Sequence, residues 1–265
     1  MTRLTRITAV LFSLATSVLS ATLPVVTGTA STTNLPGVAL IQQAKRAAVT
    51  DRPSPPLAAR SMKAPPEFLT LHLVNSHTAA VSTAHVHDVD SPPAASGNVG
   101  AGTLARGASA SFAVPTGYVG NMALSEAEYP ITADDTLIEI NFSIAKDYGN
   151  IAVADVDVSY VNGYSVPITC SCGGSVVTGC NKDLLKLNTC ADLSPENACV
   201  NPLRALIPAT AASPFFAPCQ GAAWTFVNDG DADAWGSCQS GQISCCIGTA
   251  CPANPDQRKR SCRKN

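Results

Sequence analysis

Four histidines that lie close together, His72, His77, His85 and His87, are the first side chains whose spacing suggests chemistry. In an extended segment His85 and His87 point to the same side of the backbone, and two neighbouring imidazoles can bind copper or zinc. A stable site needs further ligands, and no third ligand is evident beside this pair. We therefore expect an ordinary surface group of histidines, with no metal ion and no cofactor.

The eleven cysteines form the second chemically active group, and all of them lie between Cys170 and Cys262. The spacing of Cys170-Ser171-Cys172 is not that of a zinc finger. Behind an export signal, such a density of cysteines indicates a disulfide framework, so a cysteine nucleophile is not expected. The sequence also has no Gly-x-Ser-x-Gly, His-Glu-x-x-His or phosphate-loop motif.

An odd number of cysteines requires an explanation, and the basic tail at residues 258–265 offers one. Cys262 lies in this tail, directly after the dibasic pair Lys259-Arg260. Cleavage at the pair would remove Cys262 and leave ten cysteines, which suffice for five bridges. The alternative is that the tail is kept, and that Cys262 stays free or bonds another chain.

The N-terminal part of the chain looks like an export signal followed by a processing segment. Residues 1–20 combine basic residues with an apolar run, Ile7 to Leu19, that is too short to span a bilayer. We expect a cleaved signal peptide, and hence a secreted protein with no membrane partner. Residues 21–66 are rich in proline and poor in aromatics, which is typical of a disordered pro-segment or linker. Lys45-Arg46 is a candidate cleavage site within it, or else the linker stays uncut.

The charge distribution argues against one class of partner. All 19 acidic residues lie within 51–256, whereas residues 47–257 hold only eight Lys and Arg, so this body has a formal net charge of −11. A body of this charge repels polyphosphates, and we expect no nucleic-acid partner.

Period-two patterns indicate the elements that position these residues. Apolar residues alternate with polar ones in "FLTLHLV", "SASFAVP", "TLIEINFSI" and "IAVADVDVSYV". Such runs between glycine and proline punctuation are typical of half-buried antiparallel strands, and they predict a β-sandwich or barrel over residues 67–169. Glu139 and Asp157 fall on the polar faces of their strands. From Cys170 the pattern weakens, and we expect a cysteine-rich loop region over residues 170–257 that completes the same domain.

Asn162-Gly163 is a strong local turn signal. It separates "VSYV" from "YSVPI", and a two-residue type I′ turn needs the positive φ angles that Asn and Gly tolerate. The sequence therefore predicts a hairpin at this point, with Pro167 near the end of its second strand.

Several of these segments, taken in order, resemble the thaumatin-like (osmotin) family. They are "TLIEINF", "DVDVSYVNGYSVPI", "FFAPCQGAAWTF" and "CQSGQISCC". The resemblance extends from about Phe68 to Pro252, and it is greatest to the divergent fungal members. It implies a flattened antiparallel β-sandwich with a disulfide-rich loop region, and an acidic cleft between the two. Some members of that family bind or slowly hydrolyse β-1,3-glucan.

The resemblance also implies site residues, although this chain departs from the family pattern. Glu139 and Asp157 match two acids of the family cleft, and Asn162 stands where a second Asp is usual. The third Asp position falls at Gly221 or Gln220, neither of which is acidic, and no Arg precedes Glu139 at the family position. These differences weaken the case for catalysis.

Three functions follow as alternatives. The first is a monomeric secreted protein that binds β-glucan or a related carbohydrate at the cell wall, through Glu139, Asp157 and Asn162. The second is a weak endo-β-1,3-glucanase that uses Glu139 and Asp157 as its two carboxyl groups. The third is a structural or antigenic protein in which both residues simply face solvent.

Two further expectations concern modification and bridging. The sequon Asn141-Phe142-Ser143 makes Asn141 a glycosylation candidate, and a glycan there would crowd the face that carries Glu139. The resemblance also implies three disulfides, and it leaves Cys170, Cys172, Cys238 and Cys245 open. The implied pairs are Cys180 with Cys219, Cys190 with Cys199, and Cys246 with Cys251.

Overall fold

The computed structural model describes residues 64–97, 102–144 and 151–259. The expected signal peptide, the Lys45-Arg46 pair, Arg260 and Cys262 lie outside these residues. No helix within the described ranges is long and apolar enough to cross a membrane.

Two β-sheets make up most of the described chain. The larger sheet has the strand order β11-β10-β13-β1-β5-β3. The bounds of its strands, in that order, are Ser175–Cys180, Ile168–Cys172, Gln242–Ile247, Phe68–Asn75, Ser109–Pro115 and Ser96–Gly97. The smaller sheet has the order β4-β2-β6-β7-β8. Its strands are Gly102–Leu104, Val81–His87, Tyr118–Glu126, Thr136–Ile144 and Ala152–Ser159.

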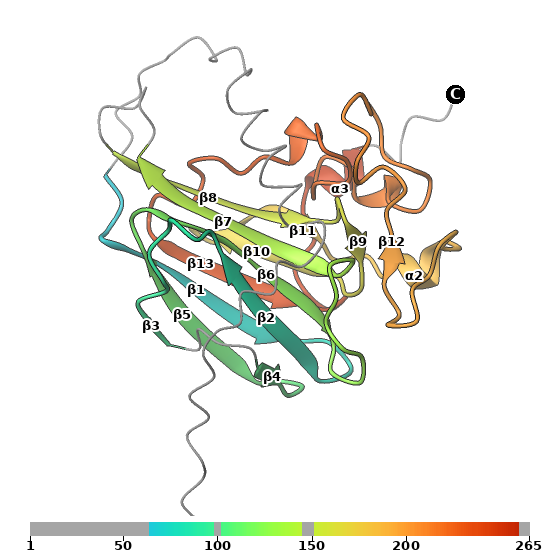
Figure 1. Cartoon of the computed structure of the whole chain (residues 1–265), viewed down its shortest axis with the longest axis horizontal. Helices are drawn as coiled ribbons and strands as arrows, with labels where there is room; N and C mark the ends of the chain where they lie inside the picture. Colours follow the sequence, from blue (N-terminus) through green and yellow to red (C-terminus); the bar gives the residue numbers. More distant parts are fainter. Residues whose placement is uncertain (1–63, 98–101, 145–150, 260–265) are drawn as a thin grey trace, which may run out of the picture. The chain divides into compact units, whose positions relative to one another are not determined.

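The two sheets pack face to face around one apolar core, as the alternating sequence predicted (Figure 1). From β1, Leu69 and Leu71 are fully buried, and from β7 Ile138 and Phe142 are fully buried as well. All of these belong to one cluster that draws on both sheets. Ile144, which the pattern placed with them, is instead 53% exposed at the end of its strand. The expected all-β sandwich with disulfides is thus confirmed.

Short elements gather beside one end of the sheets (Figure 1). They include a separate two-stranded sheet formed by β9 and β12, two short α-helices and two 3-10 helices. Their bounds are Gly163–Tyr164 for β9, Cys199–Val200 for β12, Leu184–Leu187 for α2, Asp256–Lys259 for α3, Ala217–Cys219 for η1 and Gly230–Ala232 for η2.

The cysteine-rich region contributes more to the sheets than its sequence indicated. Strands β10, β11 and β13 all come from the part of the chain after Pro167, and β13 pairs with β1 in parallel. Cys170 is therefore not the point where the sheet ends. The alternation was hidden because cysteines occupy the apolar positions: Cys170 and Cys172 point inward with Ile168, and all three are buried.

The predicted Asn162-Gly163 hairpin is wrong. Neither residue has a positive φ, and β9 pairs with β12 rather than with β8. The backbone of this segment is bound by the later loops, because Asn201 N donates to Asn162 O over 2.9 Å. Gly163 is required for a different reason: a Cβ there would lie 2.1 Å from Asp134 O.

Five disulfides join the described cysteines. Three of them are the pairs that the resemblance implied, Cys180–Cys219, Cys190–Cys199 and Cys246–Cys251. The other two are Cys170–Cys245 and Cys172–Cys238, and they fasten β10 to β13 and to the loop before β13. The adjacent cysteines Cys245 and Cys246 bond to different partners, Cys170 and Cys251.

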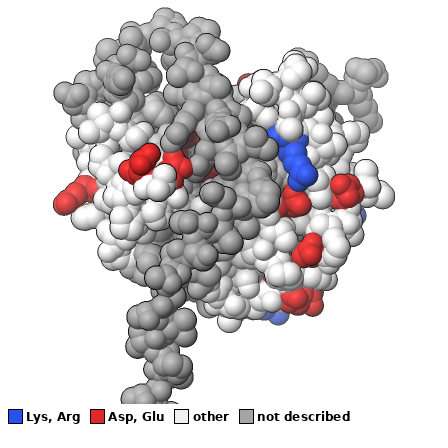
Figure 2. All heavy atoms as spheres, in the orientation of Figure 1, with Lys and Arg blue, Asp and Glu red and all other residues white. Residues whose placement is uncertain are grey.

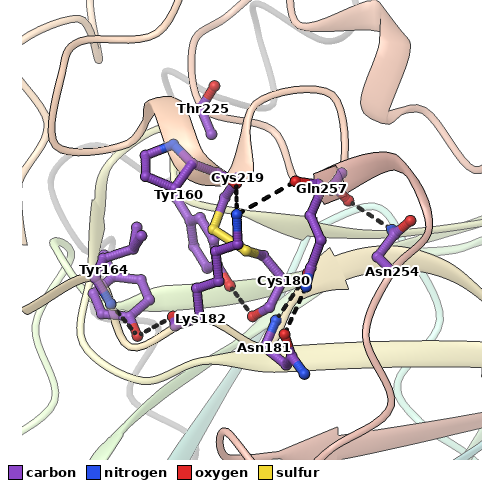
Figure 3. Close-up of a disulfide and its surroundings, with 12 residues drawn as sticks. Tyr160, Tyr164, Cys180, Asn181, Lys182, Cys219, Thr225, Asn254 and Gln257 are labelled. Atoms are coloured by element: carbon purple, nitrogen blue, oxygen red, sulfur yellow. Dashed lines mark hydrogen bonds between the residues drawn. A yellow bond between two sulfur atoms is a disulfide. The ribbon is translucent and has the colours of Figure 1, made fainter. Parts of the chain in front are cut away.

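Three polar residues beside the Cys180–Cys219 bridge hold the helix α3 in place (Figure 3). We name Asn181, Lys182 and Gln257 the polar clasp. Gln257 Nε2 donates to Asn181 Oδ1 over 2.7 Å, and Asn181 N donates back to Gln257 Oε1. Lys182 Nζ donates to the backbone oxygens of Pro218 and Gln257. The clasp thereby ties α3 to the strand β11 and to the turn at Cys219.

Candidate functional site

A polar row crosses the face of the smaller sheet that is turned away from the core. Asn121 on β6 lies opposite Glu139 on β7, and Glu139 lies opposite Asp157 on β8. Directly opposed residues of antiparallel strands place their side chains on one face, about 5 Å apart at Cβ. The structure thus brings together the two acids that the resemblance singled out.

These acids do not face open solvent. Glu139 is 8% exposed and Asp157 is 1% exposed, so the interpretation of both as solvent-facing strand residues is wrong. Asp157 Oδ1 accepts a hydrogen bond of 2.9 Å from the backbone N of Ala234. Asp157 therefore anchors the loop that runs past the edge of the sheet.

That loop, residues 228–235, is here named the acidic loop because Asp229, Asp231 and Asp233 alternate along it. Its third acid meets the sheet: one carboxylate oxygen from each of Asp155, Asp157 and Asp233 lies within 4.8 Å of the other two. We name these three residues the aspartate triplet. It joins two side chains of β8 to one from a segment more than seventy residues later in the chain.

The electrostatics of the triplet favour positive charge or hydrogen-bond donors. Two unit charges about 5 Å apart repel by roughly 3 kcal/mol at an effective dielectric constant of ~20. In the view of Figure 2, acidic side chains in red are more numerous on the described surface than basic ones in blue.

Asp229, the first acid of the acidic loop, holds the preceding segment at Gly221 and Thr225 in place. It is 2% exposed, and its Oδ2 accepts from the Thr225 hydroxyl over 2.7 Å and from the backbone N of Thr225 and Gly221. The resemblance placed the third family acid at Gly221 or Gln220. A carboxylate does contact this turn, but it comes from Asp229.

Asp155, Asp229 and Asp233 were not predicted as site residues from the sequence. The signal available was the alternation of acids, Asp155 with Asp157 in one segment and Asp-x-Asp-x-Asp at 229–233 in the other, because spaced acids recur in cation-binding loops. Only the fold reveals that Asp233 joins the first pair while Asp229 turns away from it.

A pocket of about 500 Å³ lies beside the acidic loop, which supplies part of its lining. Its floor includes Gln220, Phe226 and Asp229, all of them buried, and its rim includes the exposed residues Thr210 and Asp231. The Gln220 side chain is held by its Oε1, which accepts from Ala212 N over 3.3 Å. Ligand pockets in proteins are commonly about 300–1,000 Å³, so a small molecule fits this volume.

Asn162, the third residue implied by the resemblance, is 2% exposed and lies outside the polar row. Its side-chain nitrogen has no hydrogen-bond partner among the described residues. Its backbone oxygen is engaged with Asn201, so the residue marks the junction between β8 and the cysteine-rich loops.

Asn141 lies on the same face as the polar row, directly opposite Asp155. Its Oδ1 is buried and finds no hydrogen-bond partner within the described chain. A glycan on this residue would stand over the aspartate triplet, so glycosylation of Asn141 and ligand binding at the triplet are expected to exclude each other.

The four histidines do not form one group. His72 contacts Ser111 and Gln242 on the larger sheet, and His77 pairs with Glu126 over 2.6 Å. The His85 ring packs edge-on against Phe112, with 4.9 Å between centroids, and burial lowers its pKa to about 4. His72 and His77 thus have hydrogen-bonding roles, and His85 has a packing role.

Comparison with known proteins adds no assignment. No protein-family model matches the chain, and no curated protein matches it.

Proposed function

We propose that this chain is a secreted, thaumatin-like protein that binds β-glucan or a related neutral carbohydrate at a cell wall or in the extracellular space. The observation that carries the proposal is the pocket of about 500 Å³ beside the acidic loop. The five disulfides favour an oxidising, extracellular compartment, in which such bridges persist.

The chemistry of the pocket suits a polyhydroxylated ligand. Sugar hydroxyls both donate and accept, and they match the carboxylate of Asp231, the amide of Gln220 and the hydroxyl of Thr210. Phe226 supplies apolar surface on the floor. Because two acids line the pocket, a neutral sugar is favoured over a phosphorylated one.

Binding is better supported than hydrolysis. A glycosidase needs two carboxyl groups that flank the scissile bond. Glu139 and Asp157 instead project side by side from one sheet face, and Asp157 is 1% exposed with one oxygen engaged by Ala234 N. A carboxylate in that position cannot reach an anomeric carbon without loss of the loop contact, so we do not favour the glucanase alternative.

A binding assay with insoluble β-1,3-glucan tests the proposal. The secreted protein should be depleted from solution, and Thr210→Ala or Asp231→Ala should weaken binding about 3- to 10-fold each, as expected for loss of one hydrogen bond. Both residues are exposed, so neither change should impair folding. Asp192→Ala, an exposed acid that does not line the pocket, serves as the matched control.

The same samples separate binding from hydrolysis. Binding without release of reducing sugar agrees with the proposal. Release that is abolished by Glu139→Gln would favour the glucanase, and failure to bind any β-glucan would overturn the proposal.

A further inference from the structure

One of the four histidines, His72, lies on the outer face of the larger sheet, where the carbohydrate proposal assigns no role. Its neighbours along β1, Leu71 and Leu73, are both buried in the core. Because successive side chains of a strand point to opposite faces, His72 points away from the core. Its side chain is half-buried there, so solvent and small molecules have access to it.

Side chains from the two neighbouring strands contact the two ring nitrogens of His72. Ser111 on β5 lies directly opposite His72, and its Oγ is 2.6 Å from Nδ1. Gln242 on β13 lies opposite Thr70, and its Oε1 is 3.1 Å from Nε2. We name Ser111, His72 and Gln242 the serine–histidine–glutamine array. It crosses three strands that are adjacent in the sheet (Figure 1).

Gln242 determines which ring nitrogen of His72 carries the proton. An amide oxygen only accepts hydrogen bonds, so Nε2 must donate to Gln242 Oε1. A neutral imidazole has a single N–H, so Nδ1 has a lone pair and accepts from the Ser111 hydroxyl. The Ser111 proton is therefore already directed at a base. This is the arrangement that activates a serine as a nucleophile.

The sheet around the array is free of formal charge. None of the residues of β1, β5 and β13 is Asp, Glu, Lys or Arg, although the body as a whole is strongly acidic. No carboxylate from these strands competes with Gln242 for the Nε2 proton. A neutral substrate would meet no fixed charge of these strands on this face.

We propose that Ser111 is a nucleophile, activated by His72, that accepts the acyl group of a neutral ester. Ser111 Oγ attacks the carbonyl carbon, and its proton passes to His72 Nδ1. The bond from that carbon to the leaving oxygen breaks, and the leaving oxygen takes the proton from His72. Water then attacks the acyl-serine by the same route, so the net reaction converts ester and water into acid and alcohol. Gln242 is a positioning residue, since it acts through His72.

The strand pairing narrows the substrate class. Strand β1 pairs with β5 on one side and with β13 on the other, so its amides are committed to the sheet. They cannot stabilise an oxyanion, and one such donor is worth about 10²–10³ in rate. An ester whose leaving group departs easily depends less on this stabilisation than an amide does. We therefore expect slow turnover of aryl esters and no cleavage of peptide bonds.

The inference is independent of carbohydrate binding, and p-nitrophenyl acetate tests it on the full-length secreted protein. We expect release of p-nitrophenol and, after quenching in acid, an acetyl group on the peptide that contains Ser111. Ser109 is the internal control, because it is an exposed serine of the same strand but lies opposite Val74. Acetylation of Ser111 that does not exceed that of Ser109 would overturn the inference.

Variants assign the roles of serine and histidine. Ser111→Ala should reduce p-nitrophenol release to the rate without protein, and His72→Gln should lower it about 10²-fold or more, as for loss of a general base. The double variant should be no slower than either single one, because the two residues act as a unit. Ser109→Ala should leave the rate unchanged. If Ser111→Ala also leaves it unchanged, the reaction occurs elsewhere and the inference is wrong.

Gln242 provides a readout that a purely structural contact would not give. Gln242→Ala should slow acylation several-fold, because His72 loses the partner that fixes its tautomer. Gln242→Glu should make it faster than in the unchanged protein, because a carboxylate stabilises the imidazolium better than an amide does. Gln242 is exposed, so neither change should impair folding. Equal rates in all three proteins would contradict the positioning role.

Discussion

At the scale of single residues, the structure separates what a residue type suggests from what its surroundings impose. Asn162-Gly163 has the composition of a hairpin turn, but the pair forms none, because Asn201 binds the backbone of Asn162. Asp157 is a residue of the type that serves as a catalytic acid, but its side chain is buried and holds the acidic loop through Ala234 N. Neither outcome could be predicted from the local sequence, since both depend on residues far along the chain.

Gly163 provides a direct test of this residue-level account. Gly163→Ala should destabilise the protein by about 3 kcal/mol or more, because the new Cβ would meet the backbone oxygens of Asp134 and Cys199. Gly102→Ala is the control: a Cβ there meets nothing within 4 Å, and the change should alter the free energy of unfolding by less than about 0.5 kcal/mol. Equal effects of the two changes in urea unfolding would refute the close-approach explanation.

His85 predicts a pH dependence of stability. Burial lowers its pKa from 6.5 to about 4, so between these values the unfolded chain binds a proton that the folded protein does not. The free energy of unfolding should therefore fall as the pH is lowered through this window, by up to about 3 kcal/mol in total. Asp135, whose pKa burial raises to about 6, acts in the opposite direction over part of the same window.

A comparison of variants isolates the His85 contribution. The difference in free energy of unfolding between the unchanged protein and His85→Gln should change between pH 6.5 and 4, while the Asp135 contribution cancels. A difference that stays constant across this range would mean that His85 titrates normally in the folded state.

At the scale of elements, the sequence predicted the strands whose two faces differ and missed those in which cysteine replaces aliphatic residues. The sequences of β1, β5 and β7 alternate clearly, because one of their faces is the core, whereas β6 was not predicted. Strand β10 does not look like a strand, since Cys170 and Cys172 supply its inward face. Strand β8 was predicted with one polar face, yet all of it is buried, because later loops cover its edge.

At the outer edge of β8, the side chain of Gln239 hydrogen-bonds to backbone groups that a neighbouring strand would otherwise bind. Gln239 Oε1 accepts from Ala154 N over 2.7 Å, and Gln239 Nε2 donates to Ala152 O over 3.1 Å. Gln239→Ala should cost about 1–3 kcal/mol, because both backbone groups lose their partners. Hydrogen exchange at the Ala154 amide should also become faster.

Gln242 offers a matched control for this prediction. It is exposed, and the described hydrogen bond of its side chain is the one to the His72 ring, over 3.1 Å. Gln242→Ala should change the free energy of unfolding by less than about 0.5 kcal/mol. If Gln239→Ala is equally mild, the edge of β8 is held by other contacts.

At the scale of the whole molecule, the bridges connect segments that local sequence patterns cannot bring together. The all-β class and the presence of disulfides could be predicted, because they follow from periodicity and cysteine density. The parallel pairing of β1 with β13 and the meeting of Asp233 with β8 could not, because each joins residues that are far apart in the chain. The candidate site was therefore predicted only as far as Glu139 and Asp157.

The span of each bridge predicts its effect on stability. Cys170–Cys245 closes a separation of 75 residues, whereas Cys190–Cys199 closes one of 9. In the chain-entropy description, loss of the longer bridge costs about 4.5 kcal/mol and loss of the shorter one about 2.5 kcal/mol. Thermal unfolding of the two double Cys→Ala variants should show the larger fall in Tm for the first, and the reverse order would contradict this assignment of roles.

The central claim is that the pocket beside the acidic loop binds a β-glucan, and hydrogen exchange with a soluble β-1,3-glucan oligosaccharide tests it most directly. We expect slower exchange on addition of the sugar at residues 208–210 and 220–231, with little change on the remote faces of the larger sheet. The absence of any protection, or protection confined to segments outside these two, would contradict it.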